Sequence, residues 1–404
     1  MGAVVGVAAL LAACSASGGG EVAASTAAAA ATATTTVAAL PTSPPSSSTA
    51  TPSPTPPAAE SCVAGTLAAM SAAQKAGQLV MSGVPAGNAD GGRAQVRSLR
   101  LGGVFLAGRT SRSAAGIRAD VKRLPAQTAG DARIGLLVAT DQEGGLVQAL
   151  RHGDWPTIPR ATTQGTYSAA RLTARWRTWA GDLHDAGLNM DLAPVADVVP
   201  AGTASSNPPI GVFGRQYGSQ PAAVARSVAA VTAGMRDAKI IPTVKHFPGL
   251  GRVHANTDTS TKAVDRVTTA SSPSLQAFRA GFDAGAVVMV SSASYPRLDP
   301  DALAVFSSKM ITGLLRGRLG YDGVVMTDDV GRAVAVRSVP TGQRATRFVA
   351  AGGDLVLTAF PERAPALVKA IRDEAAASAS FRAKVDASVT RVLTLKEEQG
   401  LLTC

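Results

Sequence analysis

From residue 62 onward, the chain alternates apolar runs with amphipathic segments, and the pattern repeats eight times. Several runs are continuous stretches of Val, Leu and Met, which is typical of parallel strands covered on both faces. We expect strands at 78–83, 103–107, 135–140, 190–194, 240–244, 287–291, 323–327 and 354–358. We expect helices at 168–186, 221–238, 273–284, 309–319 and 343–351, and two closing helices within 361–402. The repeated unit predicts an α/β fold, a single-domain (β/α)8 TIM-type barrel; a doubly wound open sheet is the alternative that periodicity leaves open.

The N-terminal region has a different composition from the predicted barrel. Residues 1–14 have the pattern of a secretory leader, and their Leu-Ala-Ala-Cys ending is similar to a bacterial lipobox. We therefore expect lipidation of Cys14 and an extracytoplasmic protein, either lipid-anchored to the outer face of the bacterial cell membrane or secreted. A disordered apolar N-terminus is the alternative. Residues 15–61, almost entirely Ala, Ser, Thr, Pro and Gly, predict a disordered tether, followed by a barrel domain at 62–404.

The two other cysteines, Cys62 and Cys404, flank the globular region. A disulfide between them is expected in an oxidising compartment, because the ends of a barrel lie close together. Two free or buried thiols are the alternative. No Cys-x-x-Cys or His-x-x-x-His spacing indicates a metal site, and we expect no metal or organic cofactor.

The chain carries 39 Lys and Arg against 28 Asp and Glu, a formal net charge of +11. These cations are scattered singly, without a dense basic block or interleaved aromatic residues, so we expect a solvated basic surface and no nucleic-acid partner. Contact with a membrane is expected only through the lipid anchor. No segment reads as an assembly surface, which favours a monomer.

Polar clusters follow three of the expected strands. Asp141 follows the third strand, Lys245 and His246 follow the fifth, and Asp328 follows the seventh. In a barrel these strand ends converge on one pocket, so the separate clusters become one candidate site. Each cluster alone has a simpler interpretation, since the Asp328-Asp329 pair is also suited to cap a helix and a single lysine is often a surface charge.

Five segments carry a family resemblance. They are residues 134–145 around Asp-Gln-Glu-Gly-Gly, 189–198, 214–218, the Lys-His-Phe-Pro-Gly-Leu-Gly run at 245–251, and 311–329. Together they resemble glycoside hydrolase family 3, and in particular its single-domain bacterial β-N-acetylglucosaminidases. The resemblance extends from about Ala73 to Leu395, which is most of the globular region.

The resemblance implies a role for each matching residue. Asp328 matches the nucleophile that forms a glycosyl-enzyme intermediate, from which water releases the sugar with retained configuration. Asp141 matches the carboxylate that clamps hydroxyls of the non-reducing sugar. Arg215, Lys245 and His246 match donors that grip the ring and its substituents. Asp329 is expected to support this site rather than to react.

The chain departs from the family in the loop after Lys245 and His246. Family acetylglucosaminidases usually carry an Asp-Ser-His triplet there, whose His is the general acid and base. Counted without gaps, Asn256-Thr257-Asp258 falls on the triplet, so Asp258 takes the place of that His. A carboxylic acid with a raised pKa can protonate a leaving oxygen, so we expect Asp258 to act as the acid. His254 is a competing candidate that lies out of register.

A second departure follows the Asp-Gln-Glu-Gly-Gly motif, where the family usually has Arg-Val-x-Arg. This chain has Leu146-Val147-Gln148-Ala149, so Ala149 stands where a sugar-binding arginine is expected, and Arg151 reaches that place only with a backbone shift.

The combined expectation is a retaining exo-glycosidase that removes terminal β-linked N-acetylglucosamine, or a related β-glycoside, from cell-wall glycans or fragments. The carboxylate at position 258 disfavours a phosphorolytic variant because it would repel phosphate. The alternative function is a catalytically impaired member that binds glycans at the cell surface.

Overall fold

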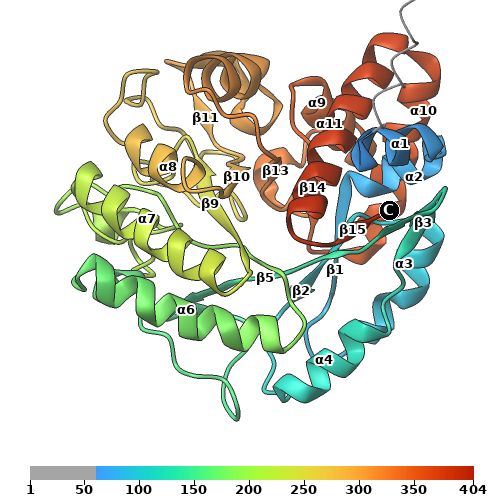
Figure 1. Ribbon diagram of the computed structural model, residues 1–404. Coiled ribbons are helices and arrows are strands. Elements are labelled where there is room, and N and C mark those ends of the chain that lie inside the picture. The colour runs from blue at the N-terminus through green and yellow to red at the C-terminus, as the bar shows by residue number, and fades with distance from the viewer. Residues whose placement is uncertain (1–60) are drawn as a thin grey trace, which may run out of the picture. The chain divides into compact units, whose positions relative to one another are not determined.

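The computed structural model describes residues 61–404 of the chain. At its centre is a sheet of eight parallel strands, in the order β13-β10-β9-β8-β5-β2-β1-β14 (Figure 1). The strands are β1 (Val80–Pro85), β2 (Gly103–Ala107), β5 (Leu137–Thr140), β8 (Met190–Asp191), β9 (Ile241–Phe247), β10 (Val287–Val290), β13 (Val325–Thr327) and β14 (Val356–Thr358).

The sheet closes into a barrel. β14 pairs with β1 in a register that places Val356 beside Val80, and β13 and β14 meet through a parallel bridge between Met326 and Leu355. The backbone N–H of Thr327 donates to the carbonyl of Leu355 at 3.0 Å. Because an open sheet keeps two unpaired edges, this closure confirms the (β/α)8 prediction and makes the doubly wound alternative wrong.

All eight expected strands overlap observed ones, and the differences lie at their ends. β9 runs beyond the expected end at residue 244 and includes Lys245 and His246, because the carbonyl of Lys245 still accepts from Ala196 N–H at 2.7 Å. It ends at Phe247, because the following Pro248 has no N–H to continue the ladder. β8 is shorter than the expected 190–194, since Pro194 likewise cannot donate.

Helices surround the barrel, and each expected helix has an observed counterpart. The α-helices are α1 (Cys62–Ala69), α2 (Ala72–Gln78), α3 (Arg93–Leu99), α4 (Ala114–Lys122), α5 (Ala161–Gln164), α6 (Ala169–Asp185), α7 (Pro221–Asp237), α8 (Leu275–Phe282), α9 (Thr341–Ala350), α10 (Ala364–Ala377) and α11 (Ala379–Glu398). The segment expected as a helix at 309–319 is a π-helix, η4 (Lys309–Arg318).

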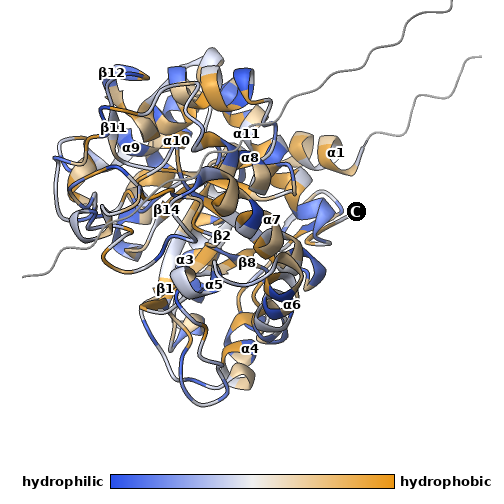
Figure 2. Ribbon diagram, turned by 90° about the vertical axis from the view of Figure 1, so that its left-hand side faces the viewer, coloured by the Kyte–Doolittle hydropathy of each residue, from blue (hydrophilic) through white to orange (hydrophobic). Residues whose placement is uncertain are grey.

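Helix α6 illustrates why these segments form. Ser168 caps its first turn by accepting from Arg171 N–H at 3.3 Å. Its buried residues, among them Leu172, Trp176 and Leu183, recur at the spacing of one helical face, which packs toward the barrel. Figure 2 shows the resulting mixture of polar and apolar residues along α6 and α7.

The two ends of the described chain meet at the amino ends of the strands. β15 (Leu402–Thr403) pairs with β4 (Ala132–Ile134), which pairs with β3 (Gln127–Ala129), and β4 leads directly into β5. α1 packs against α11, and Cys62 and Cys404 are joined by a disulfide. The expected leader, Cys14 and the expected tether up to residue 60 lie outside the described residues.

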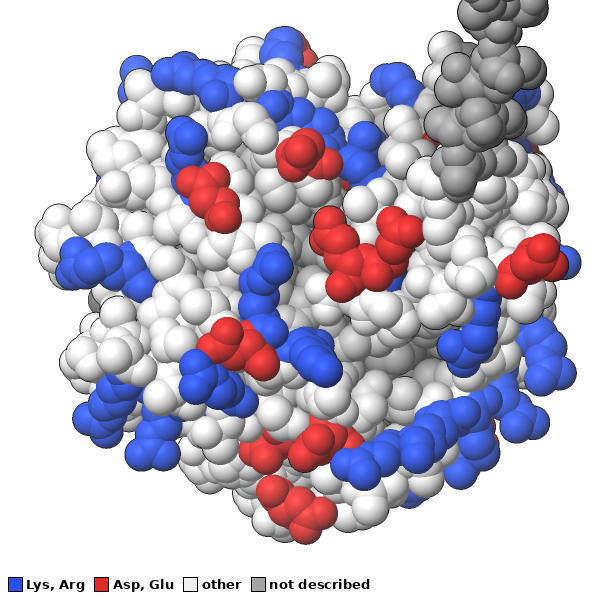
Figure 3. All heavy atoms as spheres, in the orientation of Figure 1, with Lys and Arg blue, Asp and Glu red and all other residues white. Residues whose placement is uncertain are grey.

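The charged surface is mixed rather than uniformly basic on the face shown in Figure 3, where Lys and Arg alternate with Asp and Glu. Within residues 61–404, no helix combines the length and apolar character needed to span a bilayer. In the same part of the chain, no group of three or more His, Cys, Asp or Glu is arranged to hold a metal ion.

Candidate active site

A cavity of about 490 Å³ lies at the carboxyl ends of the barrel strands, and we call it the catalytic cavity. It brings together every residue that the sequence proposes as catalytic or substrate-binding. These residues are Asp141, Arg215, Lys245, His246, Asp258 and Asp328. The convergence of strand ends, expected from a barrel, is therefore observed.

Lys245 is the cationic centre of the cavity floor. It points from the end of β9, is almost fully buried, and places Nζ 2.6 Å from Asp141 Oδ1 and 2.6 Å from Glu143 Oε1. Burial lowers the pKa of Lys245, but the carboxylates of Asp141 and Glu143 outweigh it and the pKa is raised. The side chain therefore stays an ammonium group and fixes Asp141 in place.

Glu143 is a residue whose importance the sequence analysis missed. Arg215 donates to both of its carboxylate oxygens, Nε to Oε2 at 2.9 Å and Nη2 to Oε1 at 2.7 Å. Burial raises the pKa of Glu143, yet Arg215 and Lys245 together hold it at about 2. Side chains two residues apart in an extended segment point to the same side, so Asp141 and Glu143 lie on one face. This spacing could have identified Glu143 as a site residue from the sequence.

A second missed residue, Asp197, orients His246. Its Oδ2 lies 2.7 Å from His246 Nδ1, and its Oδ1 accepts from the backbone N–H of Leu250 at 2.7 Å. Asp197 is fully buried, so this pairing leaves His246 Nε2 directed toward Arg215, whose Nη2 lies at 3.4 Å. The imidazole is thus held by one carboxylate, as expected for a ring that presents a single nitrogen to a ligand.

Asp328 and Asp329 follow β13 and have different surroundings. Asp328 continues the ladder by donating its N–H to the carbonyl of Val290 at 3.2 Å, and it lines the cavity. Asp329 Oδ1 accepts from Gly331 N–H and from Ala359 N–H, both at 2.9 Å. Asp329 therefore stabilises the turn that presents Asp328.

Asp258 reaches the same cavity from the loop after β9. Asn256 Oδ1 accepts from Asp258 N–H at 2.9 Å, and the carbonyl of Asp258 accepts from Val334 N–H at 3.2 Å, which ties the loop to the segment following Asp328. Partial desolvation, and next the negative charge of Asp328, raise the pKa of Asp258 to about 6. The residue is still exposed at the cavity mouth, so a substrate that displaces water there would raise the pKa further.

The comparisons with known proteins agree with this geometry. The sequence profile of the glycosyl hydrolase family 3 N terminal domain matches residues 71–395. The chain is 35% identical to a beta-hexosaminidase of Alkalilimnicola ehrlichii over 285 residues, which is 68% of this chain and 78% of that protein. The chain belongs to glycosyl hydrolase family 3. It is accordingly a glycoside hydrolase of the β-N-acetylhexosaminidase-like type.

Solved structures of the family superpose on this barrel. A beta-N-acetylhexosaminidase from Beutenbergia cavernae is 44% identical, with a TM-score of 0.78 over 81% of this chain and 99% of that one. A family 3 beta-N-acetylglucosaminidase from Paenibacillus is 32% identical, with a TM-score of 0.74 over 82% of this chain and 63% of that one.

The structure also places the residues that competed for a role in this family 3 site. His254 is exposed, with Nδ1 2.9 Å from the carbonyl of Ser206, and it does not line the catalytic cavity. Arg151 bonds to the carbonyl of Gln148 and does not line the cavity either. The arginine that does line the cavity near Ala149 is Arg109, from the loop after β2, which no sequence motif indicated.

Asp191, at the end of β8, is fully buried near the charged groups of Lys245, Asp141 and Glu143. Its Oδ1 accepts from Gln142 N–H at 2.9 Å, whereas Oδ2 has no partner among the described residues. Burial is the main cause that raises the pKa of Asp191 to about 8. A neutral Asp191 leaves two carboxylates, Asp141 and Glu143, opposite the two cations Lys245 and Arg215.

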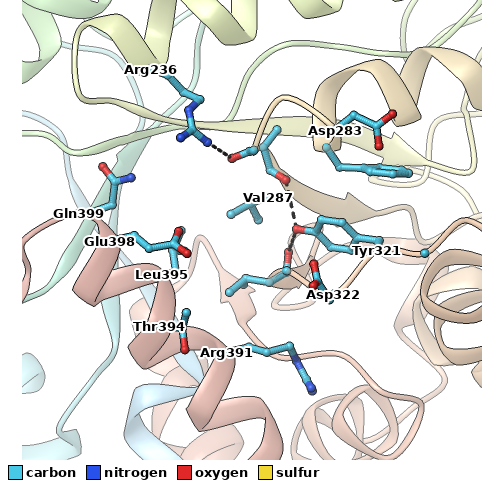
Figure 4. A pocket seen from close by; sticks show the side chains of 16 residues that line it. Arg236, Asp283, Val287, Tyr321, Asp322, Arg391, Thr394, Leu395, Glu398 and Gln399 are labelled. Atoms are coloured by element: carbon cyan, nitrogen blue, oxygen red, sulfur yellow. Dashed lines mark hydrogen bonds between the residues drawn. The ribbon is translucent and has the colours of Figure 1, made fainter. Parts of the chain in front are cut away.

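A larger cavity, of about 690 Å³, lies at the other end of the barrel (Figure 4). Two of its polar side chains have partners in the protein: Tyr321 Oη donates to the carbonyls of Ala286 and Val324, and Arg391 pairs with the buried Asp354 at 2.7 Å. None of the residues proposed as catalytic or substrate-binding lines it. The catalytic cavity, although smaller, is therefore the candidate active site, and it lies at the carboxyl ends of the strands, where TIM-barrel enzymes have their active sites.

Proposed function

We propose that this protein is a retaining exo-β-N-acetylhexosaminidase that removes terminal β-linked N-acetylglucosamine. The observation that carries the proposal is the pair of carboxyl groups in one cavity, Asp258 with a pKa of about 6 and Asp328. Two carboxyl groups in one cavity, one of which has a raised pKa and can act as an acid, are what retaining glycosidases require. The relatives named above support the choice of sugar.

In the first step, an Asp328 oxygen attacks the anomeric carbon while the Asp258 carboxylic acid gives its proton to the glycosidic oxygen. The bond from the anomeric carbon to that oxygen breaks, the aglycone leaves as an alcohol, and the sugar remains as an ester of Asp328. In the second step, the Asp258 carboxylate takes a proton from water, whose oxygen attacks the same carbon and frees Asp328. Two inversions give net retention.

The remaining charged groups position the sugar. Asp141 offers carboxylate oxygens to hydroxyl groups, and Lys245, Arg215 and His246 offer donors to hydroxyl and acetamido oxygens. All are held by partners before any ligand arrives, as Lys245 is by Asp141 and Glu143 at 2.6 Å. Preorganisation of this kind reduces the cost of ordering the site on binding.

We further propose that the protein is extracytoplasmic and acts on cell-wall glycans. The leader and lipobox-like sequence ending at Cys14 support an extracytoplasmic lipoprotein, and that location suits cell-wall glycans or their fragments as substrate. The absence of any expected assembly surface supports a monomer.

The test uses 4-nitrophenyl N-acetyl-β-glucosaminide with the wild type, Asp328→Ala and Asp258→Ala. We expect turnover by the wild type, with the β-anomer of the free sugar as the first product by NMR. Azide should restore turnover of Asp258→Ala and give the β-glycosyl azide, because azide needs no base to attack the ester. Activity that persists in Asp328→Ala, or an α-anomer as first product, would contradict the mechanism.

A further inference from the structure

A second cavity, of about 220 Å³, adjoins the catalytic cavity, and we call it the annex. It shares Phe105, Arg109, Asp141, Leu146 and Val147 with the catalytic cavity, whereas Asp258 and Asp328 do not line it. Because water occupies about 30 Å³ per molecule, the annex has room for a group of roughly seven non-hydrogen atoms.

The small side chain of Ala149 forms part of the annex wall. Ala149 is buried, and its methyl group leaves open the space that a longer side chain at this position would occupy. Leu106 and Phe105, also buried, supply an apolar wall from β2. The annex is thus an open recess with an apolar wall on one side.

Arg109 is the available polar donor of the annex. Its only hydrogen bond within residues 61–404 is from Nη2 to the carbonyl of Leu146 at 2.8 Å, and it makes no ion pair in that part of the chain. Gln148 is fully used, since it donates to Leu150 and Pro156 and accepts from Ile158. The charge of Asp141 is neutralised by Lys245 at 2.6 Å, so among the described residues the remaining unpaired charge that lines the annex is the positive charge of Arg109.

The position of the annex defines which part of a sugar would reach it. Asp328 follows β13 and Asp141 follows β5, and these strands lie four places apart in an eight-stranded barrel, which is diametrically opposite. C1 and C4 are opposite corners of a pyranose ring. A sugar with C1 at Asp328 therefore directs its C3–C4–C6 edge toward Asp141 and the annex beyond it.

We propose that the annex is a subsite for an anionic substituent on the non-reducing sugar, carried on the ring edge opposite the anomeric carbon, and that Arg109 selects it. The inference rests on the proposed function. A carboxylate on a short alkyl arm, such as the lactyl ether of N-acetylmuramic acid, and a sulfate ester at O6 share this chemistry. The guanidinium would pair with the anion, and the apolar wall would pack against the arm.

The test compares kcat/KM for four 4-nitrophenyl β-glycosides, those of N-acetylglucosamine, N-acetylmuramic acid, its methyl ester and 6-O-sulfo-N-acetylglucosamine. The two anionic sugars distinguish the two sources, and the ester keeps the shape of the muramide without its charge. The variants are Arg109→Gln, Ala149→Leu, which fills the annex, and Arg175→Gln, which removes an exposed arginine of α6 as a control.

We expect the wild type to cleave at least one anionic substrate. Arg109→Gln should lower the ratio of its kcat/KM to that of the unsubstituted sugar about tenfold or more, the loss typical of a charge-assisted hydrogen bond. The muramide ester should be insensitive to Arg109→Gln yet impaired by Ala149→Leu, and Arg175→Gln should leave all ratios as in the wild type.

The inference is overturned if the wild type cleaves only the unsubstituted sugar, or if Arg109→Gln leaves the ratio as it was. If the wild type cleaves none of the four, the proposed function fails, and calorimetric titration with the free sugars then decides the annex separately. Tighter binding of N-acetylmuramic acid or the 6-sulfate than of N-acetylglucosamine, lost in Arg109→Gln, would uphold the subsite; equal binding would refute it.

Discussion

Arg215 grips Glu143 with two parallel hydrogen bonds, of 2.9 and 2.7 Å, in the floor of the catalytic cavity. Glu143 is buried and Arg215 is mostly buried, so water screens the pair only weakly, and Lys245 shares the same carboxylate. Because Glu143 lies between the two cations and binds both of them, the floor is held in place before a sugar binds.

Replacement of Glu143 by Gln should destabilise the fold, because it leaves Arg215 and Lys245 buried with Asp141 as their remaining carboxylate. We expect a loss of about 3–5 kcal/mol in the free energy of unfolding, measured with urea. Asp237→Asn, which breaks the exposed pair of Asp237 with Arg177, is the control and should cost about 0–1 kcal/mol. Equal losses in the two variants would contradict the assigned role.

The rate of hydrolysis should fall as the pH rises through the pKa of Asp258, which is about 6, because the acid must be protonated to release the aglycone. This fall with pH should be measured in kcat/KM, because the pH dependence of kcat/KM reports the pKa values of the free enzyme. Removal of the neighbouring charge in Asp328→Asn should lower the pKa of Asp258, and carbon NMR of the labelled carboxyl group would detect it. A pKa of Asp258 that stays constant in this variant would show that the two carboxyl groups do not interact.

Lys396, which lies outside the active site, should make the stability of the fold depend on pH. It is fully buried, with Nζ donating to Gln78 Oε1 at 2.6 Å and to the carbonyl of Gly102 at 2.8 Å, and burial lowers its pKa from 10.5 to about 7. Between these two pH values the unfolded chain holds a proton that the folded chain has lost. Stability should therefore rise with pH across this window, by up to about 1.4 kcal/mol per pH unit.

The measurement is urea unfolding from pH 7 to pH 10 for the wild type, Lys396→Met and Lys122→Met. The difference between the wild type and Lys396→Met should grow with pH, whereas the exposed Lys122 should contribute no such slope. Parallel curves for all three proteins would mean that Lys396 is charged in the folded state.

The disulfide between Cys62 and Cys404 closes a loop of 342 residues. The double variant Cys62→Ser/Cys404→Ser should be less stable by about 2–5 kcal/mol, largely because its unfolded chain is less constrained. Dithiothreitol should lower the melting temperature of the wild type toward that of the variant and leave the variant unaffected. A wild-type melting temperature that dithiothreitol does not change would argue against the bond.

Much of the barrel was predictable because its strands are short, apolar on both faces and separated by amphipathic helices. The strand ends were less predictable, as β9 shows, since Lys245 and His246 are polar yet lie in the strand, where Glu143 and Asp197 compensate them.

The site was predictable where a strand end carries a distinctive motif, as for Asp141 and Asp328. Glu143, Asp197 and Asp191 were missed as functional residues because their roles depend on partners far away in sequence; Glu143 and Arg215 are 72 residues apart. Arg109 carries no local signal, and its position became apparent only from the two cavities that it lines.

The meeting of the chain ends at the amino ends of the strands has a directional consequence. Whatever precedes Ser61 joins the barrel beside Cys404 and β15, on the side away from the catalytic cavity. A tag or solid support coupled at Ser61 or at the C-terminus is therefore attached at the end of the barrel opposite the strand ends that carry Asp141 and Asp328, and it leaves the entrance to the catalytic cavity clear.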